Sequence, residues 1–423
     1  MDERATGPAG ASRDGAPHVV IVGAGYAGFA TARRLRAAPA RVTLVNPYPY
    51  HYFTTLLHEP VARPRQRERI ALPLAPYLPP NVRLWLGRAV AIDPRRRAVE
   101  VEERATGTRR WLEADWLVVA VGSEPLFFGI AGLEERALTV RDLTSGPLIR
   151  STVEHRLARY AAGAMGAEGR RIVVGGGGYT GVELAAELAE ARDDLARATG
   201  VAAHAIEIYL VEAAPTLLPG FDPALTRYVT RFLERAGVRV ITGTPIAEVT
   251  PRHVVLADGR RLEAGTVIWT GGVRAHRLVE QAGFEVDRRG RAWVDDHLQA
   301  RGFEGVYLAG DAAAFPGDDG RPLPPTAQVA LQQGEYLGRA LARRLRGLPV
   351  EPFRPRVLGT VISLGRRDGV GLLGRGYRVT GRAARVLKSA TLWRYLYRIG
   401  GARLLMRVLG GAPLQPLPGR PEP

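Results

Sequence analysis

Residues 19–28 read VVIVGAGYAG, four apolar residues followed by the glycine spacing GxGxxG, and an alanine-rich stretch continues from there. This order predicts a buried strand, a tight turn and a helix N-terminus. Gly23 lets the turn close, Gly25 lets the backbone approach a pyrophosphate, and Gly28 lets the helix pack on the strand. Because both the strand and the helix are present, we favour a dinucleotide site over a purely structural glycine turn.

The same device occurs a second time between residues 171 and 188. The segment RIVVG leads into GGGYTG and then VELAAEL, with the motif glycines at Gly176, Gly178 and Gly181. Two dinucleotide sites in one chain indicate electron transfer between two cofactors. The fold class that we predict is therefore α/β, with two Rossmann-like dinucleotide-binding domains.

The residues that end the next strand of each unit differ in charge. Glu212 follows the apolar run 208–211, where its carboxylate can accept hydrogen bonds from an adenosine ribose. A carboxylate there repels a 2′-phosphate, so the second site should prefer NADH to NADPH. Asn46 follows the run 42–45 in the first unit and can bond a ribose without carrying a charge.

Three further apolar strands end in glycine, which lets backbone come close to a ligand. These glycines are Gly122, Gly271 and Gly310. Asp311 follows the last of them, and its carboxylate can accept a hydrogen bond from a ribityl or ribose hydroxyl. A helix N-cap is the alternative role for Asp311.

Composition excludes several classes of chemistry. The 423 residues contain no cysteine, so mechanisms that need a redox-active cysteine pair or a thiolate metal site are excluded, and we predict no metal site. The formal charge is +17, and residues 351–423 hold +11 of it, as thirteen arginines and one lysine against three acidic residues. A strongly basic C-terminal end indicates that this region binds an anionic surface. Nucleic-acid binding is the competing interpretation of the charge, but no recognition motif supports it.

The positions of the motifs predict the domain boundaries. Residues 1–16 should be a disordered tail, because they contain charges and small residues but no apolar core. The first nucleotide-binding domain should occupy 17–150 and 276–350, with the second, 151–275, inserted between its two parts. Residues 351–423 should form a separate C-terminal region. No run of eighteen apolar residues is present, so no membrane-spanning segment is expected.

An aromatic loop, YPYHYFTTLLHE, follows the strand that ends in Asn46. Ligands bind at such strand ends, so this loop should lie beside a cofactor. His51 within it is a candidate proton carrier, although an isolated histidine is more often a hydrogen-bonded structural residue.

With these motifs in hand, the chain resembles the type II NADH:quinone oxidoreductases over residues 17 to about 410. The motifs that carry the resemblance are GAGYAG, GGGYTG and LAGDAA, the aromatic loop, VEAAP followed by LPGFD, and AQVALQQG at residues 327–334. The last segment is similar to the family's quinone-site helix. Gly175 and Gly272 depart from the usual pattern without removing a proposed functional side chain.

The resemblance implies FAD in the first domain, NADH in the second, and two-electron reduction of a membrane quinone, either menaquinone or ubiquinone, without proton pumping. We expect the FAD to be bound non-covalently, because no motif places a histidine or cysteine for a bond to the flavin. It places Glu183 near the nicotinamide and flavin, and it places Gln328 and Gln332 at the quinone. Pro324-Pro325-Thr326 should cap the helix that begins at Ala327, whose positive end would favour negative charge on a reduced flavin. The other role for Glu183 is to stabilise the N-terminus of its own helix.

The tail suggests how the protein reaches a quinone. Read as one helix over 385–399, it places Val386, Trp393, Leu396 and Tyr397 on an apolar face, and Lys388, Arg394 and Arg398 on the opposite face. Such a helix fits the headgroup region of a membrane, which predicts a peripheral protein at the cytoplasmic face of a bacterial membrane. The alternative is a helix packed on the protein itself or on a second subunit, and the sequence allows a homodimer. A soluble NADH-dependent flavoprotein that reduces a carrier such as a ferredoxin is the second enzyme hypothesis.

Overall fold

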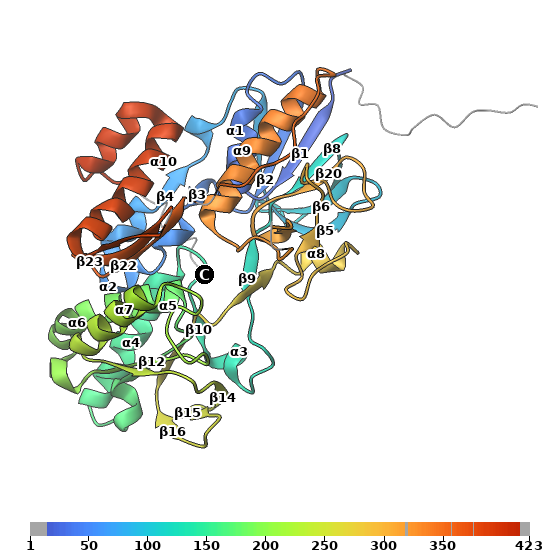
Figure 1. Cartoon of the computed structure of the whole chain (residues 1–423). Helices are drawn as coiled ribbons and strands as arrows, with labels where there is room; N and C mark the ends of the chain where they lie inside the picture. Colours follow the sequence, from blue (N-terminus) through green and yellow to red (C-terminus); the bar gives the residue numbers. More distant parts are fainter. Residues whose placement is uncertain (1–14, 318–319, 357, 375, 415–423) are drawn as a thin grey trace, which may run out of the picture. The chain divides into compact units, whose positions relative to one another are not determined.

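The computed structural model describes residues 15–317, 320–356, 358–374 and 376–414 (Figure 1). The expected tail at 1–16 therefore lies almost entirely outside the described residues. The chain forms two compact units, each assembled from three segments. Unit 1 comprises Met1–His51, Leu72–Glu124 and Val273–Val357, and unit 2 comprises Tyr52–Ala71, Pro125–Gly272 and Leu358–Pro423.

A seven-stranded sheet forms the centre of unit 1. Its order is β20 (Val306–Leu308), β8 (Trp116–Val119), β1 (His18–Val22), β2 (Arg41–Asn46), β5 (Val82–Asp93), β6 (Ala98–Glu103) and β7 (Arg109–Glu113). The first five strands are parallel, and β5, β6 and β7 pair antiparallel. In β1, Ile21 lies opposite Leu44 and Val118, and Val19 to Val22 are at most 2% exposed. The run 19–22 is continuously apolar because a central parallel strand is covered on both faces.

Two helices of unit 1 pack closely on each other. Helix α1 (Tyr26–Arg34) follows the first glycine motif, and α9 (Ala327–Arg344) contains the AQVALQQG segment; Figure 1 shows them side by side. A Cβ at Gly334 would lie 2.1 Å from the carbonyl oxygen of Ala27, and a Cβ at Gly338 would lie 2.7 Å from that of Thr31. The two glycines, one helical turn apart, therefore permit the close approach of the helices.

Unit 2 repeats the strand, turn and helix arrangement around a five-stranded parallel sheet. Its order is β10 (Leu138–Thr139), β17 (Thr266–Trp269), β11 (Arg171–Gly175), β12 (Glu207–Val211) and β13 (Val238–Ile241). Its helices include α4 (Ser145–Ala161), α5 (Tyr179–Glu190), α6 (Arg192–Thr199) and α7 (Pro223–Arg235), and a meander is formed by β14 (Ile246–Val249), β15 (His253–Leu256) and β16 (Arg261–Glu263). The domain boundary that the sequence predicted at residue 150 falls inside α4. The longest segment of unit 2 begins earlier, at Pro125.

Short elements complete the described chain. They are β3 (Tyr50–Tyr52), α2 (Glu59–Ala62), β4 (Ala71–Pro73), β9 (Ser123–Pro125), α3 (Leu133–Arg136), β18 (Val273–Ala275), α8 (Leu278–Gln281), β19 (Ala292–Trp293) and β21 (Ala313–Ala314), together with short 3₁₀ helices.

The C-terminal region is part of unit 2 rather than a separate body. It forms an antiparallel sheet of β22 (Gly359–Leu364), β23 (Asp368–Leu373) and β24 (Tyr377–Thr380), followed by α10 (Gly381–Leu409). Ile362, Leu364 and Val370 are fully or almost fully buried and belong to the same apolar cluster as the residues of α5. Strands β22 and β23 therefore contribute to the core that supports the second glycine motif.

Helix α10 does not form the single apolar face that its sequence suggested. Its backbone leaves helical geometry at Gly401, which has φ +64° and ψ −160°. Leu396 is fully buried, whereas Val386 and Tyr397, assigned to the same face, are 59% and 57% exposed. Lys388, expected on the polar face, is 14% exposed and pairs with Glu183. The face was mispredicted because the core of unit 2 covers one part of this helix. Among the described residues, no helix is both long enough and apolar enough to cross a bilayer.

Candidate functional site

The first glycine motif folds into a cradle that protein atoms close on two sides. Gly23 has φ +99°, and a Cβ there would lie 2.4 Å from the Ala120 carbonyl oxygen. A Cβ at Gly28 would lie 1.8 Å from the carbonyl oxygen of Gly23, so strand and helix tolerate no side chain. A Cβ at Gly25, by contrast, would meet nothing within 4 Å. Protein packing does not require the middle glycine, which fits a turn that leaves room for a pyrophosphate.

Asn46 holds this cradle together. Its Oδ1 accepts the Ala24 N–H at 2.9 Å, and its Nδ2 donates to the Tyr48 carbonyl at 2.7 Å. The side chain is 8% exposed. The expected ribose contact thus competes with two internal bonds that connect the glycine turn to the aromatic loop.

Residues 310 and 311, which follow β20, each have a side-chain partner that the sequence motifs did not single out. Asp311 Oδ2 accepts a hydrogen bond from Ser123 Oγ at 2.7 Å, and burial raises the pKa of its carboxyl. The buried Gln333 accepts the Gly310 N–H at 2.7 Å, which fixes a backbone with φ +71°. Asp311 does not cap a helix with its side chain, so the alternative role does not apply. The position of Ser123 directly after Gly122 was the one signal that could have identified it.

Helix α9 begins where the sequence predicted. Thr326 caps it by accepting the Val329 N–H at 3.2 Å, so Ala327 and Gln328 lie in the first turn. Gln332 uses both ends of its amide on Arg356, donating to its carbonyl at 2.9 Å and accepting its N–H at 2.8 Å. The expected quinone contact of Gln332 would have to compete with these bonds.

The second motif builds a matching cradle in unit 2. Gly176 has φ +104°, and a Cβ there would lie 2.5 Å from the Cα of Gly271. A Cβ at Gly181 would lie 1.8 Å from the Gly176 carbonyl oxygen, and one at Gly178 would meet nothing within 4 Å. Thr270 Oγ1 donates to the carbonyls of Gly175 and Gly176 at 3.0 and 2.9 Å. The geometry therefore repeats the first cradle glycine by glycine.

Glu212 lies at the edge of this second cradle. Its Oε2 accepts the Gly177 N–H at 2.6 Å, and its Oε1 accepts the Ala214 N–H at 2.8 Å. The carboxylate thereby connects the end of β12 to the phosphate turn. The remaining lone pairs of its oxygens can accept ribose hydroxyls.

Glu183, on the first turns of α5, lies in a buried ionic cluster. Its Oε1 accepts the N–H and the hydroxyl of Ser363, both at 2.9 Å, and the ammonium of Lys388 at 3.0 Å. His58 Nδ1 lies 3.5 Å from Oε2. Burial acts to raise the pKa of Glu183, but the charge of Lys388 and the Ser363 hydrogen bonds bring it below the ordinary value. Lys388 is the only lysine in the chain, and sequence reasoning had placed it on a solvent face.

One turn further along α5, Glu187 is 1% exposed. Burial raises its pKa to about 8, although Arg63 donates to its Oε1 at 2.8 Å. Ligand atoms of His58, Glu59 and Glu187 lie within 4.8 Å of one another, as in a metal site. Arg63 already donates to Glu187 and Arg385 already pairs with Glu59, so these arginine partners explain the group without a metal ion. No motif in the sequence predicted that α2 would lie beside α5.

His51 lies in the core of unit 1, with 1% of its surface exposed. Its Nδ1 donates to the Ala24 carbonyl at 2.9 Å, and its ring stacks on Phe29 at 5.4 Å between centroids. Burial lowers its pKa to about 4, so the ring is neutral at pH 7. These contacts support the structural alternative for His51.

Comparison with known proteins identifies the family. The model of the pyridine nucleotide-disulphide oxidoreductase family matches residues 17–334. A protein named type II NADH:quinone oxidoreductase from Staphylococcus epidermidis is 35% identical over 399 residues, which cover 92% of this chain and 97% of that protein. A Staphylococcus aureus protein of the same name is also 35% identical over 399 residues. The chain belongs to the type II NADH:quinone oxidoreductase family.

Solved structures show the same fold. NDH2 from Plasmodium falciparum in complex with NADH superposes with a TM-score of 0.81 at 18% identity, covering 95% of this chain and all of that one. The sulfide:quinone oxidoreductase of Aquifex aeolicus gives a TM-score of 0.73 at 21% identity, covering 95% and 93%. Within the type II NADH:quinone oxidoreductase family, this chain has both glycine cradles but no cysteine, so disulfide chemistry of the broader family is excluded for it.

Proposed function

We propose that this chain is a non-proton-pumping NADH:quinone oxidoreductase that holds FAD non-covalently in unit 1 and takes NADH at unit 2. When bound, FAD accepts a hydride from NADH and passes two electrons to a quinone. The observation that carries the proposal is the match over 97% of a named type II NADH:quinone oxidoreductase. Two glycine cradles in a chain without cysteine support it, since they leave two nucleotides as the electron carriers.

In unit 1, the FAD-binding group comprises the glycine cradle with Asn46, Gly122 and Gly310, the carboxyl of Asp311, and the N-terminus of α9 at Ala327. The raised pKa of Asp311 fits a carboxyl group that hydrogen-bonds neutral hydroxyls rather than cations. The open space over Gly25 and Gly122 is where backbone can face the ligand. Gln328 supplies an amide donor for a flavin or quinone carbonyl.

In unit 2, the NADH-binding group comprises Gly176, Gly178, Gly181, Gly271 and Glu212. Glu183 is the candidate catalytic carboxylate near this group, because it lies two residues after the last motif glycine. The Lys388 ammonium keeps Glu183 ionised, so this side chain can accept a hydrogen bond at neutral pH.

We also propose that the protein attaches peripherally to the cytoplasmic face of a bacterial membrane, where its quinone dissolves. The last part of α10 exposes Met406 at 65% and Leu409 at 50%, beside the exposed Arg403 and Arg407. Exposed apolar side chains interleaved with arginines suit an anionic headgroup layer.

The test is to purify the full chain in detergent, record its visible spectrum and measure NADH oxidation with a short-chain quinone. We expect a flavin spectrum, release of the flavin by acid precipitation, and quinone-dependent NADH oxidation. Flavin that stays in the pellet would contradict non-covalent binding. Electron transfer to a ferredoxin that is faster than transfer to quinone would favour the soluble-carrier hypothesis instead.

A further inference from the structure

An exposed phenylalanine occupies an unfavourable backbone conformation in unit 2. Phe128 has φ +53° and is followed by Gly129 at φ +68°, and the Ile130 N–H donates to the Phe127 carbonyl at 3.1 Å. This is a turn with both central residues left-handed, for which asparagine and glycine are preferred at the first position. The ring of Phe128 is nevertheless 59% exposed. Neither local backbone preference nor core packing explains a phenylalanine here, and such residues concentrate at functional sites.

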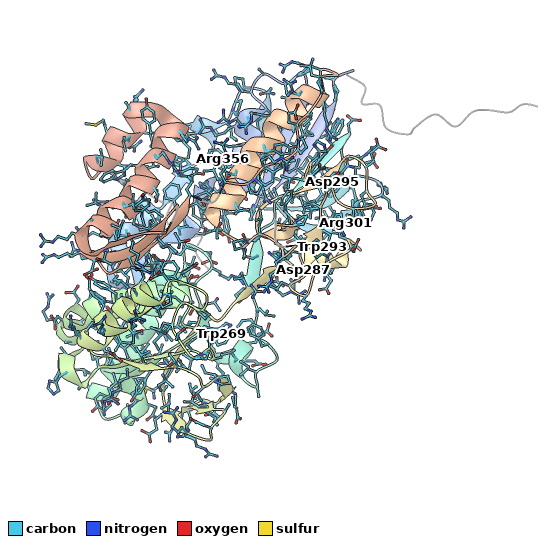
Figure 2. All side chains as sticks on the ribbon, viewed as in Figure 1. Trp269, Asp287, Trp293, Asp295, Arg301 and Arg356 are labelled. Atoms are coloured by element: carbon cyan, nitrogen blue, oxygen red, sulfur yellow. The ribbon has the colours of Figure 1, made fainter. Side chains whose placement is uncertain are left out.

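The turn is fastened to the strand that ends beside the second cradle. The Leu126 N–H donates to the Gly272 carbonyl at 3.1 Å, and Trp269 Nε1 donates to the Leu126 carbonyl at 2.9 Å. The Phe128 ring meets the Trp269 indole edge to face, with centroids 6.4 Å apart, and a Cβ on Gly272 would lie 3.3 Å from that ring. Trp269, labelled in Figure 2, is the last residue of β17. The ring is therefore held at the carboxyl end of β17.

Strand order shows which half of a dinucleotide comes to this end. β11, which carries the phosphate turn, lies between β12 on one side and β17 on the other. Glu212, at the end of β12, is placed for the adenosine ribose. A dinucleotide that crosses the end of β11 must then have its nicotinamide half on the β17 side, where Phe128 lies.

We infer that Phe128 is a substrate-positioning residue whose exposed ring forms an apolar wall for the nicotinamide nucleoside of NADH. This inference rests on the proposed function, because it takes NADH as the ligand of unit 2. A fixed ring loses little conformational freedom on binding and can contact a flat heterocycle by its edge or face. An asparagine at position 128 would suit the turn better, but it would not provide an aromatic ring to contact the nicotinamide.

The test measures nucleotide binding to the full-length flavoprotein by calorimetry, with NAD⁺ and ADP as the two probes. Phe128→Asn should weaken NAD⁺ roughly three- to tenfold, as expected for the loss of an aromatic contact, while ADP binding stays within about twofold. Phe128→Tyr should restore NAD⁺ affinity. Leu148→Ala on α4 is the matched control, because Leu148 is also 53% exposed, and it should change neither affinity.

Thermal unfolding separates folding from binding, since asparagine suits the turn and Phe128→Asn should unfold no lower than the parent. Equal weakening of NAD⁺ and ADP would overturn the inference, because the ring would then shape the whole loop. Unchanged NAD⁺ affinity in Phe128→Asn would also overturn the inference. The exposed ring would then be assigned to a contact with a second copy of the chain. If the parent protein binds neither probe, the proposed function fails first, and that outcome is distinct from a parent that binds both.

Discussion

At the scale of single residues, burial changes what several side chains can do. His51 is neutral because it is enclosed beside Phe29, and Glu187 keeps its proton to about pH 8 because burial outweighs its pairing with Arg63. Glu183 stays ionised in an equally buried position because Lys388 and Ser363 compensate its charge. Residue type alone does not distinguish these outcomes, since the contacts come from distant segments.

The buried neutral His51 should make unit 1 sensitive to acid. Its pKa is about 4 in the folded chain against about 6.5 when unfolded, so below pH 6.5 the unfolded state takes up a proton that the folded state refuses. Stability should fall as pH drops from 6.5 to 4, by up to about 3 kcal/mol from this group. Urea unfolding at several pH values should show a flatter profile for His51→Gln. The exposed His204→Gln is the control, and a slope equal to the parent's in His51→Gln would contradict the assignment.

Glu212→Gln should narrow the preference for NADH over NADPH. The carboxylate repels a 2′-phosphate, and at a few ångströms near the surface that repulsion is worth about 1 to 2 kcal/mol, or roughly 5- to 30-fold in the ratio of kcat/KM values. Glutamine retains an acceptor for one of the two backbone N–H groups that Glu212 now bonds. Steady-state kinetics with both nucleotides measure the ratio. An unchanged ratio would limit Glu212 to holding the turn.

Gln328→Ala should separate the two half-reactions. In stopped-flow experiments we expect flavin reduction by NADH to remain nearly intact, and reoxidation by quinone to slow roughly two- to twelvefold, from the loss of one neutral hydrogen bond of about 0.5 to 1.5 kcal/mol. Slowed flavin reduction with normal reoxidation in Gln328→Ala would overturn its quinone role.

Glu183→Gln tests the other side of the reaction in the same stopped-flow experiments. It should slow one half-reaction if Glu183 positions NADH or moves a proton, and it should slow neither half-reaction if Glu183 only stabilises α5.

At the scale of elements, the glycine motifs predicted both cradles because their spacing determines the local backbone. The start of α9 was also predictable, since Thr326 follows two prolines and caps the helix. The face of α10 was not predictable from periodicity. A helix with apolar residues at two sides can turn either one inward, and here Leu396 and Lys388 both contact the rest of unit 2.

The contact between α1 and α9 should be intolerant of side chains at Gly334. A methyl group there would lie 2.1 Å from the Ala27 backbone oxygen, so the helices must separate. We expect Gly334→Ala to destabilise the fold by about 1 to 3 kcal/mol and to reduce bound flavin, since Gln333 is adjacent. Unfolding temperature and flavin content are the measurements. Arg339→Ala on the exposed side of α9 is the control, and flavin retention equal to this control would contradict the prediction.

At the scale of the whole molecule, basic charge concentrates in the C-terminal region, and the membrane attachment that we propose concerns the exposed last part of α10. The double variant Arg403→Glu, Arg407→Glu should reduce co-sedimentation with anionic vesicles at least tenfold, because each reversal removes and then opposes about 1 kcal/mol of attraction. Arg227→Glu, Arg231→Glu on the exposed side of α7 changes net charge equally and should bind as the parent does. Equal loss in both variants would mean that net charge alone drives association.

The amino-acid sequence by itself determined the two nucleotide motifs, their strands and the cap of α9, because glycine spacing, apolar runs and capping residues act within a few neighbours. Tertiary structure decided what surrounds them. It brought Lys388 and Ser363 from the C-terminal region to Glu183, committed Gln332 to Arg356, and set Phe128 at the end of β17. These partners lie up to about two hundred residues apart, and such contacts depend on how whole layers pack, which no local pattern encodes.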